Sequence, residues 1–117
     1  MIGEEFNMQN LYKEIVDILK DHNKTINDIK FISMDISESW TESNIVNIDI
    51  NNFLSIAKTT NYDDGYGGTE IPEDLKIVGD NWWLERHEYD GSEWFEFKTL
   101  PNKPTKTVYI DRIKKEW

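Results

Sequence analysis

The residues whose types could support catalysis or binding are concentrated in one stretch of the chain, from Trp82 to Thr99. A histidine beside carboxylates can take part in general acid–base chemistry. With 23 acidic residues in 117, such neighbours arise easily by chance, so we expect no enzyme activity and no catalytic residue. Tryptophans, in contrast, concentrate in binding hot spots. We therefore take five residues of this stretch as candidate partner-binding residues: Trp83, Glu85, His87, Trp94 and Glu96.

Asp90-Gly91 at the centre of this stretch predicts a β-hairpin, because both residue types accept the positive φ angles of a type I′ turn. The resulting register places Trp82, Leu84, Arg86, Phe95 and Phe97 on a core-facing side. The other side then pairs Trp83 with Lys98, Glu85 with Glu96, and His87 with Trp94. Opposed like charges destabilise a strand pair unless a cation or proton intervenes. Two interpretations stay open: a recognition face, or indoles lying under the N-terminal helix or a loop.

The segment Asn61–Glu70 is rich in glycine, tyrosine and aspartate. Its oxygen ligands suit calcium or magnesium, but the spacing is not that of an EF-hand, and we expect no metal and no cofactor. Its glycines instead favour a tight, ordered loop, and such loops often carry binding function. The candidate contacts here and just beyond are Tyr62, Asp63, Asp64, Tyr66, Glu70, Glu73 and Asp74.

Charge is distributed unevenly along the chain. The net charge is −10, and residues 31–75 hold nine acids against the single base Lys58. Direct nucleic-acid binding needs clustered lysine and arginine, so this class is excluded. An acidic block can instead direct the protein to a basic surface, including the nucleic-acid channel of a host nuclease. The alternative is that the acidity serves solubility alone.

The periodicity of the chain predicts a small α+β fold in one domain, residues 1–117. We expect a mostly antiparallel sheet of about four or five strands, with the N-terminal helix on one face. The expected helices are 8–21 and a short one capped by Asp49, and the expected strands are 29–36, 45–48, 75–78, the hairpin 82–99 and 107–113. The expected core includes Leu11, Ile15, Phe31, Leu84, Phe95 and Phe97.

The sequence lacks the motifs that mark several classes of protein function. The chain has no cysteine, which excludes disulfides and thiol catalysis. It has no P-loop, dinucleotide fingerprint, zincin or nucleophile-elbow motif. No apolar run of 18 residues and no basic-then-apolar leader occur, so we expect a cytoplasmic protein without a membrane span or signal peptide.

Two distinctive stretches, Tyr62–Gly79 and Trp82–Phe97, resemble a group of small acidic proteins of low-GC Gram-positive bacteria and their phages. The resemblance covers roughly residues 25–104, although members often have tryptophan where this chain has Phe95. It implies a small cytosolic α+β protein and brings no catalytic residues. Its association with mobile elements favours a phage or prophage inhibitor of a host defence protein, anti-CRISPR-like. The alternatives are a regulatory adaptor of the bacterial host or a small-molecule-binding protein.

Overall fold

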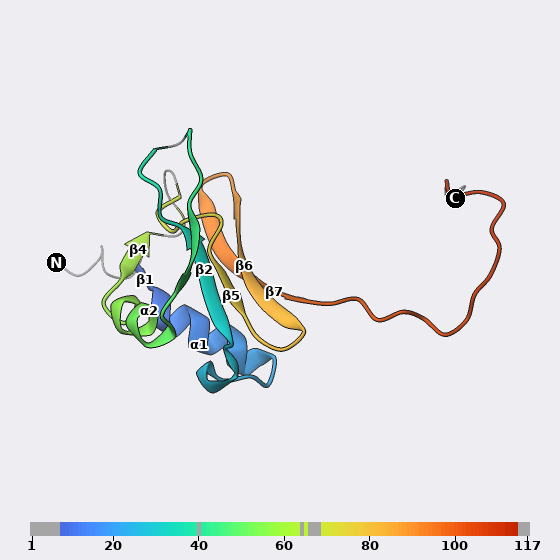
Figure 1. Cartoon of the computed structure of the whole chain (residues 1–117), viewed down its shortest axis with the longest axis horizontal. Helices are drawn as coiled ribbons and strands as arrows, with labels where there is room; N and C mark the ends of the chain where they lie inside the picture. The colour runs from blue at the N-terminus through green and yellow to red at the C-terminus, as the bar shows by residue number, and fades with distance from the viewer. Residues whose placement is uncertain (1–7, 40, 64, 66–68, 115–117) are drawn as a thin grey trace.

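A computed structural model of the chain describes residues 8–39, 41–63, 65 and 69–114. An antiparallel sheet with the strand order β3-β2-β5-β6-β7 carries two α-helices on one side, and β1 and β4 form a second, two-stranded sheet (Figure 1). This arrangement confirms the predicted α+β class. The elements are β1 Met8–Asn10, α1 Leu11–Asp21, the 3₁₀ turn η2 Ile26–Asp28, β2 Phe31–Asp35, β3 Ile45–Ile48, α2 Ile50–Ala57, β4 Asn61–Asp63, β5 Lys76–Val78, β6 Trp82–Tyr89 and β7 Ser92–Thr99.

Both helices begin at side-chain caps. The Asn10 side chain accepts a hydrogen bond from the Lys13 N–H and starts α1, so the predicted helix is three residues too long at its N-terminus. Met8–Asn10 instead pair antiparallel with Asn61–Asp63, so the first three residues of the predicted loop Asn61–Glu70 form a strand. The side chain of Asp49 accepts from the Asn52 N–H and starts α2, as the sequence predicts.

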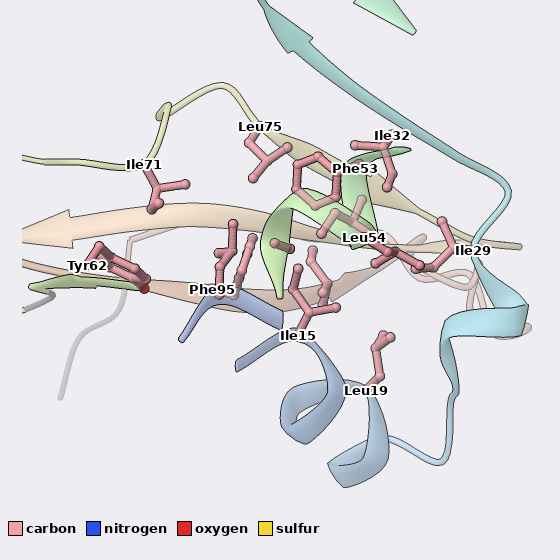
Figure 2. Packing of buried hydrophobic residues seen from close by; sticks show 14 of the residues in the cluster. Ile15, Leu19, Ile29, Ile32, Phe53, Leu54, Tyr62, Ile71, Leu75 and Phe95 are labelled. Carbon is pink, nitrogen blue, oxygen red and sulfur yellow. The ribbon is translucent and has the colours of Figure 1, made fainter. Parts of the chain in front are cut away.

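The core is one apolar cluster between the helices and one face of the five-stranded sheet, which we call the inner face. Figure 2 shows Ile15 and Leu19 of α1 and Phe53 and Leu54 of α2 packed in this cluster. The predictions for Leu11, Ile15, Leu84 and Phe95 are confirmed, and Phe97 is half-buried against the cluster. The opposite side of the sheet is called the outer face.

Phe31 was predicted to be a core residue, and this is wrong: 44% of its surface is exposed. Successive side chains of a strand point to opposite faces, and its neighbour Ile32 is the one that lies fully buried on the inner face. Because Phe31 pairs with Val78, which in turn pairs with Trp83, all three residues share the outer face.

The final strand predicted over residues 107–113 is also absent, since residues 100–114 contain no strand and are exposed throughout. Strand propensity reflects packing against neighbouring strands, and no described residue supplies such a neighbour here. The segment instead runs away from the sheet after β7 (Figure 1).

The predicted hairpin register is confirmed at every pair from Trp82–Thr99 to Tyr89–Ser92. Asp90 and Gly91 have φ angles of 51° and 87°, as a type I′ turn requires. This turn sets which side chains of β6 and β7 reach each face of the sheet, and it therefore determines the composition of the candidate site.

Candidate protein-binding face

The outer face consists of side chains from alternate positions of the sheet strands. Its first row is Phe31, Val78, Trp83 and Lys98, its second is Ser33, Lys76, Glu85 and Glu96, and its third contains Asp35, His87 and Trp94. Trp83 and Trp94 are partly exposed, and both described α-helices pack on the inner face instead. The alternative interpretation that places these indoles under the N-terminal helix is therefore wrong. The hairpin thus presents Trp83 and Trp94 on the outer face, opposite the core.

Each indole is held by a carboxylate two residues along its own strand. The Trp83 N–H donates to Glu85 Oε1 at 2.7 Å, and the Trp94 N–H donates to Glu96 Oε2 at 3.0 Å. Residues two apart on a strand share a face, so the alternating tryptophan–glutamate pattern creates these contacts locally. The N–H groups are satisfied and the rings are held in place, which lowers the entropy cost of using them as contact surfaces.

His87 lies between the two opposed glutamates of the outer face. Its Nε2 lies 2.7 Å from Glu85 Oε2 and 3.5 Å from Glu96 Oε1, while Lys98 Nζ lies 3.0 Å from Glu96 Oε1. The hydrogen bond from Trp83 lowers the pKa of Glu85, and the bond from Trp94 lowers the pKa of Glu96. Both carboxylates are therefore ionised at neutral pH. The contacts of His87 are those of a bridge between two strands.

An open pocket, which we call the acidic pocket, lies where β2 ends and β5 is about to begin. It is lined by Asp35, Ser37, Glu38, Ser39, Glu42, Pro72, Glu73 and Asp74. Asp35 belongs to the outer face, so the pocket continues that face beyond the end of β2. The structure thus brings Glu73 and Asp74 together with acids some thirty residues earlier in the sequence. All of its charged residues are acidic.

Two of these acids also order the loops around the pocket. Asp35 Oδ1 accepts the N–H groups of Ser37 at 2.8 Å and Asn44 at 3.0 Å, and the Ser37 bond is the main cause that lowers the pKa of Asp35. Asp74 Oδ2 accepts the Asp35 N–H at 3.0 Å. Glu38, Glu42 and Glu73 are exposed, and these three are the carboxylates best placed to meet a partner.

The glycine-rich segment is separate from this pocket. Tyr62, predicted as a contact residue, is 2% exposed and is a core residue, because β4 turns its ring inward. Glu70 Oε2 accepts the Asp63 N–H at 3.1 Å, so these two predicted residues order the loop. Asp64 and Tyr66 lie outside the described residues.

On the inner face, the side chain of Arg86 is 2% exposed and enters a buried network that we call the arginine network. Its guanidinium lies 2.7 Å from Glu93 Oε1 and 3.3 Å from Glu14 Oε2, and it donates to the Tyr62 hydroxyl at 3.2 Å. Tyr62 in turn donates to Glu14. Burial, followed by this bond to Glu14, raises the pKa of Tyr62 well above its usual value. The network joins α1, β4, β6 and β7.

Glu93 extends this network to the end of the glycine-rich segment. Its carboxylate accepts the N–H groups of Glu70 at 2.8 Å and Ile71 at 3.1 Å. Sequence reasoning placed Arg86 on the core side but did not identify its partners. The available signal was a charged residue on an apolar strand face, since a buried arginine requires a buried acid.

Comparison with protein-family models, curated proteins and solved structures found no match. Neither of the two α-helices in the described part of the chain is long and apolar enough to cross a membrane. Within residues 8–39, 41–63, 65 and 69–114, no three histidine or acidic side chains are placed to hold one metal ion.

Proposed function

We propose that this protein is a non-catalytic binding module that contacts a basic surface of a host protein through its outer face and acidic pocket. The observation that carries the proposal is the pair Trp83 and Trp94, held by Glu85 and Glu96 on a sheet face opposite both described helices. Ordered, partly exposed tryptophans within a polar surround are the composition of an interface hot spot.

The partner that fits this surface best has a basic channel that normally holds nucleic acid. Carboxylates of the acidic pocket and of the outer face would take the positions of phosphates, and the indoles would supply apolar anchors. The net charge of −10 disfavours a direct role on DNA or RNA. Together with the resemblance to small acidic proteins of low-GC Gram-positive bacteria and their phages, this chemistry favours a cytoplasmic phage or prophage inhibitor of a host nuclease, anti-CRISPR-like.

The test is capture of the partner from a lysate of a low-GC Gram-positive bacterium, followed by measurement of the association rate. Reversing Glu38, Glu42 and Glu73 to lysine should slow association by roughly tenfold or more at low salt, because these exposed acids would steer the encounter. Asp21→Lys, an exposed reversal at the end of α1, is the matched control and should have a small effect. If the association rate changes neither with salt concentration nor in the triple variant, the proposal that the acidic surface imitates nucleic acid is contradicted.

A further inference from the structure

Residues 100–114, which we call the arm, have the composition of a β-strand but lie outside the fold. The arm extends from the end of β7 away from the sheet, and the molecule reaches 61 Å in its longest dimension (Figure 1). Its large apolar side chains Val108, Tyr109, Ile110 and Ile113 are 61–102% exposed. The core cluster is complete without them. Contiguous exposed apolar residues of this kind mark an interaction surface.

The arm has the opposite charge to the rest of the molecule. Lys103, Lys106, Arg112 and Lys114 against Asp111 give it four bases minus one acid, a net charge of +3. In an extended chain, alternate residues share a side, so Lys106, Val108, Ile110, Arg112 and Lys114 would form one stripe. In that stripe, the β-branched pair Val108 and Ile110 lies between Lys106 on one side and Arg112 and Lys114 on the other.

The outer face and the acidic pocket together have the complementary composition. They hold seven carboxylates (Asp35, Glu38, Glu42, Glu73, Asp74, Glu85, Glu96) against two lysines (Lys76, Lys98), which is a net charge of −5 with His87 neutral. They also expose the apolar surface of Phe31 and of the two held indoles. A basic, β-branched strand is therefore a matching ligand for this face.

We propose that the arm of one copy lies across the outer face of a second copy, and that the reciprocal contact forms a symmetric dimer. The eleven residue-to-residue steps from Thr99 to Ile110 can span about 36 Å at ~3.3 Å per step, more than the roughly 20 Å across a five-stranded sheet. Pro101 and Pro104 keep the start of the arm extended, which disfavours a reversal onto the outer face of its own copy.

The dimer has a regulatory consequence, which rests on the proposed function. A host protein with a basic surface would compete with the arm for the same outer face. Partner binding would then release the arm and dissociate the dimer. The dimer itself depends on the chain alone, so its test needs no partner and can fail or succeed independently of the proposed function.

The test is the mass of the full chain by sedimentation equilibrium across a concentration series. We expect a concentration-dependent dimer that weakens as salt rises. Val108→Asp with Ile110→Asp should yield a monomer, and Lys106→Glu with Lys114→Glu should weaken the dimer at least tenfold. These side chains are exposed, so the fold should be unchanged by circular dichroism. Lys20→Glu, an exposed reversal on α1, is the control and should leave the dimer intact.

A mixing experiment distinguishes exchange from other contacts. A copy with the altered arm and a copy with Trp94→Ser should each be monomeric, but their mixture should form a heterodimer through the one intact arm and the one intact outer face. A chain that is monomeric at every concentration overturns the proposal. Protection of the arm from protease in such a monomer would mean that the arm binds the sheet of its own copy, and this outcome overturns the proposal too. A dimer that survives the arm substitutions overturns it as well.

Discussion

The two faces of the β6–β7 hairpin place two neighbouring basic residues, Arg86 and His87, in opposite settings. Arg86 points to the inner face, where its side chain is 2% exposed between Glu14 and Glu93. His87, the next residue, points to the outer face, where its side chain is 35% exposed between Glu85 and Glu96. Both residues therefore lie between two carboxylates, and the difference between them is burial and the origin of those carboxylates.

That difference separates structure from recognition. The carboxylates around Arg86 include one from α1, and Glu93 also binds the backbone after the glycine-rich loop, so the arginine network holds distant segments together. The carboxylates around His87 come from the same two strands and add no link between distant elements. Breaking a buried ion pair lowers the free energy of unfolding strongly, whereas exposed pairs contribute little to it. The outer face is thus available for binding.

The largest expected effect is the loss of the buried arginine. Arg86→Ala leaves the carboxylates of Glu14 and Glu93 buried without their cation, and we expect a loss of about 3–5 kcal/mol in the free energy of unfolding. His87→Ala, the adjacent control, should cost about 0–1 kcal/mol because its contacts with Glu85 and Glu96 lie at a partly exposed surface. Urea denaturation of both variants measures the difference. Equal losses would remove the distinction between the two faces.

The adjacent tryptophans offer the same comparison with identical side chains. Trp82 is 2% exposed on the inner face, so Trp82→Ala should cost about 3–5 kcal/mol in the free energy of unfolding. Trp83 is partly exposed on the outer face, and Trp83→Ala should cost about 1 kcal/mol. Thermal or urea unfolding distinguishes the two variants. A loss at Trp83 as large as that at Trp82 would mean that the outer indole is a core residue.

Alkaline titration tests the arginine network more finely. Because the folded pKa of Tyr62 is raised, the folded state favours the protonated phenol. The stabilisation it gives is fully present below the usual tyrosine pKa of ~10, and it is lost as pH rises through the folded value. Tyrosinate absorbance should therefore contain a late component that coincides with unfolding. Tyr62→Phe should remove that component, and a Tyr62 that titrates near pH 10 in the folded protein would contradict the network.

The smallest effect is expected on the outer face at acid pH. The pKa of Glu85 is lowered by Trp83, so its contribution to stability is present above the usual glutamate pKa of ~4.3 and is lost as pH falls through the folded value. Glu85→Gln should flatten the acid side of the stability profile slightly, because it removes the small stabilisation that the ionised carboxylate gives at neutral pH and leaves the stability at acid pH nearly unchanged. Chemical shifts of the Glu85 carboxyl group measure the titration directly. A pKa at or above the usual value would contradict the Trp83 hydrogen bond.

Local sequence signals predict the elements that depend on neighbouring residues. The Asp90-Gly91 turn establishes the hairpin register, and Asp49 marks the start of α2. The segment 29–36 has apolar residues on both faces, so alternation alone does not tell which face is buried, and Phe31 was assigned wrongly. Strand propensity likewise predicts residues 107–113 as a strand, although no described strand lies beside them.

The contacts of the candidate site likewise divide into local ones, which the sequence predicts, and long-range ones, which it does not. The tryptophan–glutamate contacts join residues two apart on one strand, and the pattern in the sequence contains them. The acidic pocket combines residues from the segments 35–42 and 72–74, and the arginine network joins Glu14 to Arg86. These long-range contacts depend on how the strands and helices pack, and no local spacing encodes them.

The most direct test of the outer face as a binding surface is the dissociation constant of the captured partner for two forms of the chain. One form is unaltered, and the other carries Trp83→Ala and Trp94→Ala together. We expect the double variant to bind at least a hundredfold more weakly, about 2.7 kcal/mol or more, while urea unfolding shows a folded protein. An unchanged dissociation constant for the folded double variant would contradict the central claim that the outer face is the binding surface.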